Sequence, residues 1–178
     1  MWSASLSLLQ RIFGDNRERA ALAPLYRAIV AAGRDPAWYE DGGVPDTIDG
    51  RFDVLAALTA LVLLRIEAEG EAGRGPTVLL TEIFVDDMDA TLRQIGIGDY
   101  VVGKHIGRMM SALGGRLGAF RDAGEDGPLA EAVRRNVFHD SPPADPALDF
   151  VARRLETFRR ALAETPLSSL YDGKVPRP

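Results

Sequence analysis

The run VLAALTALVLL, at residues 54–64, is the feature that most constrains how this chain can fold. It is apolar at nearly every position and is bounded by Asp53 and Arg65, so a helix over it is apolar on all sides. Such a helix is stable only when other elements surround it. Eleven residues are also too few to cross a bilayer, which takes about 20. The run therefore predicts a buried helix at the centre of the fold.

Apolar residues recur at the spacing of a helix along most of the remaining chain. Three further stripes of this kind occupy residues 22–30, 80–95 and 102–120. Asp145 and Pro146 favour the cap and first turn of a last helix that extends to Ala163, and a shorter helix is expected over 128–138 with Pro128 in its first turn. No stretch strongly favours a strand. The sequence therefore predicts an all-α fold, a single-domain helical bundle of about six to eight helices.

Glycine and proline mark the expected connections between these helices. They are concentrated in four stretches, which are predicted as loops: residues 33–47, 70–76, 123–127 and 140–146. We expect an N-terminal amphipathic helix over 1–15, a helical domain over 16–165 and a C-terminal tail over 166–178. The apolar side of the first helix consists of Leu6, Leu9, Ile12 and Phe13. This helix is expected to strap onto the core or to contact a membrane surface or partner.

Composition and charge argue against several classes of function. The chain has no cysteine, which excludes disulfides, thiolate catalysis and cysteine-ligated zinc. Its net charge of −5 is unlike that of a dedicated nucleic-acid binder, which is usually basic. His105 and His139 stand in no metal-ligand spacing, and no combination of side chains indicates a catalytic site. We therefore expect no enzymatic activity, no cofactor, no bound metal and no sequence-specific nucleic-acid partner.

The stretch GDYVVGKH, at 98–105, fits the G-x-x-x-x-G-K pattern of a phosphate-binding loop. That loop continues with Ser or Thr to ligate magnesium, whereas the residue after Lys104 here is His105. A predicted helix, not a strand, also precedes it. We interpret the stretch as a joint between two helices, with Gly96 ending the first in a left-handed conformation and Asp99 capping the second.

The helix after this joint is rich in glycine, although each glycine in a helix costs about 1 kcal/mol relative to alanine. Five small residues recur on one face: Gly103, Gly107, Ser111, Gly114 and Gly118. A small-residue stripe lets another helix approach closely, and that helix is either the one over 54–64 or part of another protein. Lys104, Arg108 and Arg116 are predicted near the same face. They form either a solvated surface or a docking site for an acidic or phosphate-bearing partner.

Two groups of aspartates raise the alternative of a metal-dependent enzyme. The first, Asp86, Asp87 and Asp89, is spaced D-D-x-D, where the magnesium-diphosphate motif of all-α prenyl-chain enzymes reads D-D-x-x-D. The second is Asp46, Asp49 and Asp53, at the start of the central helix. Other roles are available to these residues, because Asp89 can pair with Arg93 at i+4 and Asp49 can cap the central helix.

Two segments together resemble the ubiquinol–cytochrome c chaperone family, whose members help to assemble respiratory complex III. They are LYRAIVAAGRDPAWYEDGGVPDTIDGRFDVL, at 25–55, and FVDDMDATLRQIGIGDYVVGKHIGRM, at 84–109. The family pattern of Leu-Tyr, Pro-x-x-Tyr, Val-Pro-Asp-Thr, Asp-Gly-Arg-Phe-Asp, Asp-Met-Asp, Leu-Arg, Gly-x-Gly-Asp and Gly-Lys occurs here in order. The resemblance covers about residues 20–160 and leaves the tail after Ala163 unmatched. A minor departure is Ala32-Gly33-Arg34, where the family often has Ala-Arg.

The resemblance implies a non-enzymatic, all-α assembly factor that binds apo- or newly haemylated cytochrome b. It is expected to be a bacterial protein of the cytoplasm, peripheral at the inner face of the inner membrane, with that surface or the ribosome as a further contact. A helical scaffold with another client is the alternative. The candidate partner-binding residues are Gly103, Lys104, Gly107, Arg108, Ser111, Arg116, Asp46, Asp49, Arg51, Asp87 and Asp89. In this interpretation a groove of small residues, flanked by Lys104 and Arg108, receives a client helix.

Overall fold

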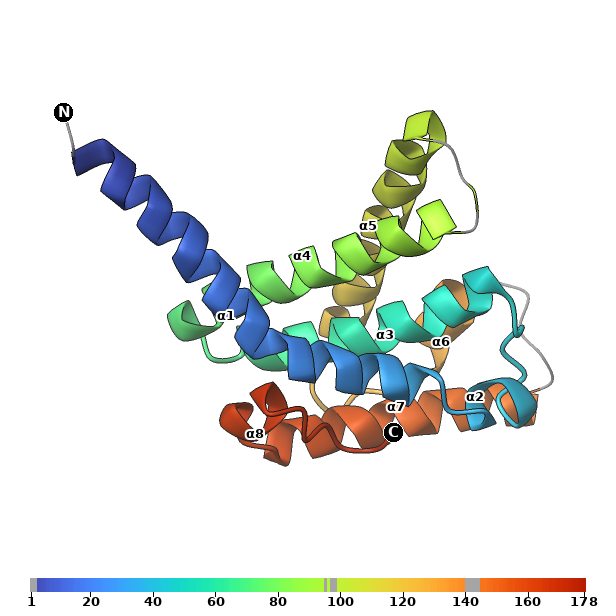
Figure 1. Cartoon of the computed structure of the whole chain (residues 1–178). Coiled ribbons are helices and arrows are strands. Elements are labelled where there is room, and N and C mark those ends of the chain that lie inside the picture. The colour runs from blue at the N-terminus through green and yellow to red at the C-terminus, as the bar shows by residue number, and fades with distance from the viewer. Residues whose placement is uncertain (1–2, 95, 97–98, 140–144) are drawn as a thin grey trace.

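The computed structural model describes the backbone of residues 3–94, 96, 99–139 and 145–178, and the side chains of 17–94, 96, 101–139 and 145–178. Within these residues the chain has eight helices and no strand, which confirms the predicted all-α, single-domain bundle (Figure 1). No helix in the described ranges is long and apolar enough to span a membrane.

The helices are, in chain order, α1 (Ser3–Gly33), α2 (Ala37–Glu40), α3 (Ile48–Glu67), α4 (Glu71–Gln94), α5 (Asp99–Asp122), α6 (Ala130–Asn136), α7 (Asp145–Glu164) and α8 (Leu167–Tyr171). Figure 1 shows α3 in the middle of the bundle, where it contacts α1, α4, α5 and α7. The short helices complete the bundle, because α6 packs on α5 and α7, and α8 packs on α1.

α3 is the central helix that the apolar run predicted. Residues 56–63 are all buried, so neighbouring helices cover it on every side. Its N-cap is Thr47, whose Oγ1 accepts a hydrogen bond from the backbone N–H of Gly50 at 3.1 Å. The prediction that Asp49 caps this helix is therefore wrong. Asp49 lies in the first turn, where a negative charge suits the positive end of the helix dipole.

α4 and α5 form a hairpin, and the start of α5 stands above the rest of the bundle in Figure 1. Gly96 follows α4 with a φ of 85°, which confirms the predicted left-handed stop. Gly98 and the side chain of Asp99, the predicted cap, lie outside the described residues. The loop predicted at 70–76 is wrong in most of its length, because α4 begins at Glu71 and includes Pro76. A proline this early in a helix disturbs few backbone hydrogen bonds.

α1 is one continuous helix from Ser3, so the described part of the element predicted at 1–15 and the stripe predicted at 22–30 belong to a single helix. The side chains of Leu6, Leu9, Ile12 and Phe13 lie outside the described residues. Leu25 and Ile29, farther along α1, are fully buried in the core. The predicted stripe at 22–30 therefore holds α1 against the bundle.

The C-terminal third follows the predicted pattern with shifts at the ends. α7 extends one residue beyond the predicted Ala163, whereas α6 begins at Ala130, so Pro128 precedes the helix instead of lying in its first turn. α8 lies inside the segment 166–178, and its Leu170 is buried in the core. The short helices α2 and α8 have too few turns to give a periodic pattern in the sequence.

Candidate partner-binding site

An apolar pocket of about 280 Å³ lies between the end of α1, the start of α3, the end of α4 and the middle of α5. Its lining residues are Val30, Gly33, Arg34, Tyr39, Ile48, Arg51, Phe52, Leu55, Asp87, Met88, Thr91, Leu92 and Met109. Every one of them belongs to residues 25–55 or 84–109, the two segments that carry the family resemblance. The fold therefore brings two motif clusters that are separate in sequence to one hollow, which we call the motif pocket.

Hydrogen bonds fix the polar side of the motif pocket. The hydroxyl of Tyr39 donates to the carbonyl of Gly33 at 2.7 Å, and Arg51 Nε donates to Asp46 at 2.6 Å. Arg51 also lies over the Tyr39 ring, at 5.9 Å from its centroid. The Val-Pro-Asp-Thr and Asp-Gly-Arg-Phe-Asp motifs thus shape one wall, as the pairing of Asp46 with Arg51 shows.

Asp87 is held from the opposite wall, where its carboxylate accepts a hydrogen bond from Tyr26 Oη at 2.8 Å. Burial and the neighbouring Asp87 raise the pKa of the Tyr26 hydroxyl well above its usual range, so this phenol stays a donor. The predicted partner-binding residues Arg51 and Asp87 therefore line the pocket, while Asp46 and Asp89 lie beside it and form ion pairs with Arg51 and Arg93.

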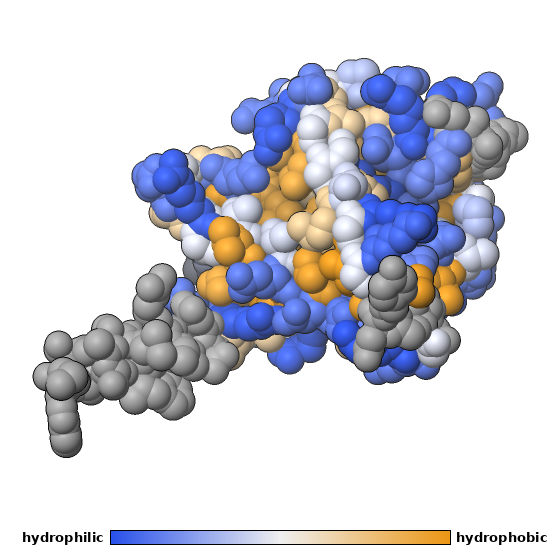
Figure 2. Space-filling model, turned by 90° about the horizontal axis from the view of Figure 1, so that it is seen from above, coloured by the Kyte–Doolittle hydropathy of each residue, from blue (hydrophilic) through white to orange (hydrophobic). Residues whose placement is uncertain are grey.

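The apolar side of the motif pocket is partly open. Ile48 at its rim is an exposed large hydrophobic side chain, and Met88 and Met109 contribute flexible thioethers that adapt to different shapes. Figure 2 shows hydrophobic residues gathered along the middle of one face of the molecule, with hydrophilic residues around them. An open apolar hollow with few polar groups suits an apolar side chain of a partner better than a reacting substrate.

The predicted small-residue stripe lies on the solvent-facing side of α5. A Cβ added at Gly103, Gly107, Gly114 or Gly118 would meet no atom within 4 Å. At 100° per residue these positions lie about 80–160° around the helix from Leu113 and Phe120, which are buried. The interpretation that the helix over 54–64 packs on the stripe is therefore wrong, because α3 packs on the other side of α5. The stripe is an exposed face, not a groove.

Lys104, Arg108 and Ser111 are exposed on or beside this stripe, as predicted. Arg116 is not, because its side chain is only 1% exposed and is ion-paired with Asp53 of α3. Arg116 is eight residues after Arg108, which rotates its side chain by about 80° around the helix axis relative to that of Arg108. This rotation points Arg116 toward the core instead of the basic side of α5. We call Gly103, Lys104, Gly107, Arg108 and Ser111 the basic glycine face.

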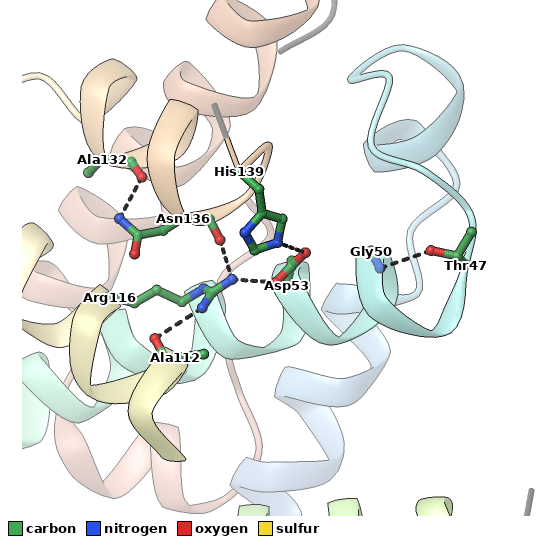
Figure 3. Close-up of polar contacts among 8 residues, drawn as sticks. All are labelled: Thr47, Gly50, Asp53, Ala112, Arg116, Ala132, Asn136 and His139. Atoms are coloured by element: carbon green, nitrogen blue, oxygen red, sulfur yellow. Dashed lines mark hydrogen bonds and ion pairs between the residues drawn. The ribbon is translucent and has the colours of Figure 1, made fainter. Parts of the chain in front are cut away.

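Arg116 is the centre of a buried polar cluster (Figure 3). Besides Asp53, its guanidinium donates to the carbonyl oxygens of Asn136 and, at 3.0 Å, Ala112. Burial raises the pKa of the Asp53 carboxyl and lowers that of Arg116, and the opposite charge of each partner counters the shift of the other. The cluster joins α3, α5 and α6.

The exposed side chain of His139 joins this cluster from the chain after α6. Its Nε2 lies 2.8 Å from Asp53 Oδ2, and its backbone has a φ of 49°, which is uncommon for a residue other than glycine. Asp53 and His139 are 86 residues apart, so no local pattern in the sequence predicts their contact. Both carboxylate oxygens of Asp53 therefore have partners within the fold.

The three aspartates at 86, 87 and 89 that suggested a metal site also bond within the fold. Asp86 pairs with Arg19, Asp87 accepts from Tyr26, and Asp89 pairs with Arg93 at 2.7 Å, the i+4 contact predicted from the sequence. Within the described ranges no three His, Cys, Asp or Glu side chains gather as ligands for a metal ion. The acidic residues instead join α1 to α4 and brace the turn before α3.

Comparison with known proteins gives a family and a similar structure. The family model described as "Ubiquinol-cytochrome C chaperone" matches residues 40–176. A solved structure, "Crystal structure of the Cbp3 homolog from Brucella abortus", is 28% identical and gives a TM-score of 0.73 over 97% of this chain and 96% of that one. A search of curated proteins gives no match. The family match includes most of the residues after Ala163, which the motifs in the sequence had left unmatched.

Proposed function

The chain belongs to the ubiquinol–cytochrome c chaperone family, and from this premise we propose that it binds newly made cytochrome b during the assembly of complex III. The observation that carries the proposal is the composition of the motif pocket, whose entire lining comes from the two segments that carry the family resemblance. Residues that only pack in the core are distributed over the whole fold. The two segments instead meet at one partly open surface.

The chemistry of the motif pocket supports binding without catalysis. Its polar lining side chains are few, and the Tyr39 hydroxyl and the Asp87 carboxylate are already engaged by Gly33 and Tyr26. The apolar remainder accommodates a bulky side chain from an apolar helix of the client. Cytochrome b is a membrane protein, so its helices expose such side chains until they pack in the complex.

The basic glycine face of α5 is the second proposed contact. Its glycines have no Cβ, which lets a client helix approach the backbone of α5 closely. Lys104 and Arg108 are placed to meet acidic client loops or lipid phosphates at the inner face of the inner membrane. The motif pocket and the basic glycine face lie on different sides of α5, so a client with several helices can engage both.

A matched pair of exposed side chains tests the motif pocket. Ile48 at its rim is 51% exposed and Val78 on α4, which does not line it, is 57% exposed, so either tolerates a charge without loss of the core. Ile48→Glu should reduce the apo-cytochrome b that co-purifies with the tagged protein by about ten-fold, since a buried charge without a partner costs several kcal/mol. Val78→Glu should leave it unchanged. Equal recovery with both variants would contradict the proposal.

The basic glycine face is tested by bulk and by charge. Gly107→Leu places a bulky side chain on the small-residue stripe, whereas Gly107→Ala adds only a methyl group. Lys104→Glu/Arg108→Glu reverses the charge, and Arg27→Glu/Arg153→Glu makes the same change of net charge at exposed positions elsewhere. We expect lower cytochrome b levels with Gly107→Leu and the first double variant only. Folded variants that support normal levels would remove α5 from the client contact.

A further inference from the structure

A second pocket, of about 580 Å³, lies where α3, α5 and α7 end. Its lining residues are Leu61, Leu64, Arg65, Glu67, Ala68, Phe120, Arg121, Gly124, Glu125, Asp126, Arg159, Arg160, Ala163 and Glu164. None of them belongs to residues 25–55 or 84–109, although all of them lie inside the family match at 40–176. We call it the end pocket.

Three arginines of the end pocket are occupied by the protein itself. Arg65 of α3 donates to the carbonyl of Leu162 near the end of α7, at 3.0 Å. Arg159 of α7 donates to the carbonyls of Gly124 and Gly127 after α5, both at 2.6 Å, and Arg121 of α5 pairs with Glu67 at the end of α3. Arg65 and Arg159 thus bind carbonyl oxygens that lack helical partners at or just beyond the C-terminal end of another helix, whereas Arg121 binds a side chain there.

Apart from Glu67, the acidic side chains that line the end pocket have no hydrogen-bond or ion-pair partner among the described residues. Within the described residues the carboxylates of Glu125, Asp126 and Glu164 accept no hydrogen bond and form no ion pair, although Asp126 lies near Arg159. All three residues are exposed. Of the four lining arginines, Arg160 alone has neither a hydrogen bond nor an ion pair within the described residues. Among the lining side chains that have neither a hydrogen bond nor an ion pair within the described residues, three carboxylates therefore outnumber one guanidinium.

The floor of the end pocket is apolar. Leu61 and Phe120 are buried in it, and Leu64 is half-buried. Ala68 and Ala163 are exposed at its sides and leave the hollow open. An apolar floor beneath a rim of unpaired carboxylates is complementary to a group with an apolar body and a cationic end.

We propose that the end pocket binds the positively charged juxtamembrane end of a client transmembrane helix, where apolar residues are followed by lysine or arginine. Loops on the cytoplasmic side of membrane proteins carry an excess of these cations next to apolar helices, which is the pattern that the floor and rim match. This inference rests on the proposed function, because it assumes a membrane-protein client.

A pair of synthetic peptides tests the inference on the full chain. Both begin with the same short apolar sequence of Leu and Ala; one ends in several lysines and the other in the same number of glutamates. We expect the lysine peptide to bind at least about ten times more tightly, by fluorescence polarisation, and to weaken as salt is added. Equal affinities, or no binding of the lysine peptide at low salt, would overturn the inference.

Two variants with matched controls place that binding in the end pocket. Glu125→Gln/Asp126→Asn/Glu164→Gln should weaken the lysine peptide by about ten-fold, whereas Glu18→Gln/Glu40→Gln/Asp41→Asn, at exposed sites elsewhere, should not. Ala163→Trp should fill the hollow and block binding, and Thr157→Trp, also exposed on α7, should leave it intact. Binding that survives both pocket variants would overturn the inference.

Failure here is distinguishable from failure of the proposed function. If the lysine peptide does not bind but cytochrome b still co-purifies through the motif pocket, only the end pocket is excluded. If the peptide binds while cytochrome b does not co-purify, the end pocket recognises cationic apolar segments of a different client.

Discussion

Arg116 shows how one buried charge organises three helices. Its guanidinium has partners in Asp53, Asn136 and Ala112, and it lies over the Phe52 ring at 5.7 Å from the centroid. Phe52 also lines the motif pocket, so the cluster supports the wall of that pocket from behind. A buried ion pair of this kind adds little stability over an apolar replacement, but removing one partner is expensive.

Asp53→Ala should therefore lower the free energy of unfolding by about 3–5 kcal/mol, because it leaves the Arg116 charge buried without its counter-ion. Asp53→Leu/Arg116→Met removes both charges and should recover much of that loss. Urea unfolding followed by circular dichroism measures both. A single variant as stable as the wild type would show that the pair is not needed to hold α3 and α5 together.

The ion pair of Asp35 and Arg154 gives a pH-dependent stability. Arg154 hydrogen-bonds Asp35 at 2.6 Å and holds the pKa of that carboxyl below its ordinary value, aided by the N–H of Ala37. Arg154 itself lies over the buried Trp38 ring, at 4.3 Å from the centroid. A carboxyl with a lowered pKa stabilises the fold above its ordinary pKa of about 3.9, and this is lost as the pH falls through the lower value.

Asp35→Asn should accordingly destabilise the protein at neutral pH and have progressively less effect below about pH 4. Because Asp35 is 42% exposed and water screens the pair, the loss at pH 7 is expected to be about 1 kcal/mol or less. Urea titrations of both proteins between neutral and acidic pH measure it. A difference that grows as the pH falls would have the wrong sign for this pair.

Residue-scale roles were the hardest to predict from the sequence. The i+4 pair of Asp89 with Arg93 was predictable because both residues lie on one helix. The contacts of Asp53 with Arg116 and His139 depend on how α3, α5 and the chain after α6 pack, which helical periodicity does not determine. Arg116 therefore looked like a surface cation, although its position on α5 places it toward the core.

At the scale of elements, the glycines of α5 differ from those that the fold requires. A Cβ at Gly50 would lie 2.0 Å from the carbonyl oxygen of Pro45, and one at Gly73 would lie 2.1 Å from that of Ile66. Gly103 and Gly114 have open space around the same position. The first two glycines serve close backbone contacts within the chain, whereas packing within the chain does not require the latter two.

Gly103→Ala and Gly114→Ala should each raise the free energy of unfolding by up to about 1 kcal/mol, because alanine favours the helix and meets no atom. Gly50→Ala and Gly73→Ala should lower it, since their methyl groups clash with backbone oxygens. Thermal unfolding measures all four. Destabilisation by the α5 substitutions would mean that the stripe is packed against another element.

Element existence was predictable where several turns repeat the pattern. The central helix and the stripes at 22–30, 80–95 and 102–120 all gave helices, because each buries one side in the core. The boundaries of the helices were harder to predict, because most of the glycine- and proline-rich residues 70–76 form the first turns of α4. The solvent-facing position of the stripe on α5 follows from the buried side of that helix, which the sequence alone left open.

At the scale of the whole molecule, the bundle presents its two pockets in different places. The motif pocket lies between the end of α1, the start of α3, the end of α4 and the middle of α5, and the end pocket lies where α3, α5 and α7 finish. Figure 1 shows α3 and α7 running in the same direction, so their ends lie on one side. Under the proposed function, a client with several helices would meet distinct surfaces for an apolar side chain and for a cationic helix end.

The central claim, that this protein is needed for the assembly of cytochrome b into complex III, is tested most directly in the cell. The measurement is a reduced-minus-oxidised haem spectrum of membranes from a strain in which the gene is deleted. The b-type signal should fall in the deletion strain and return when the wild-type gene is restored. A deletion strain whose b-type signal equals that of the parent would contradict the account.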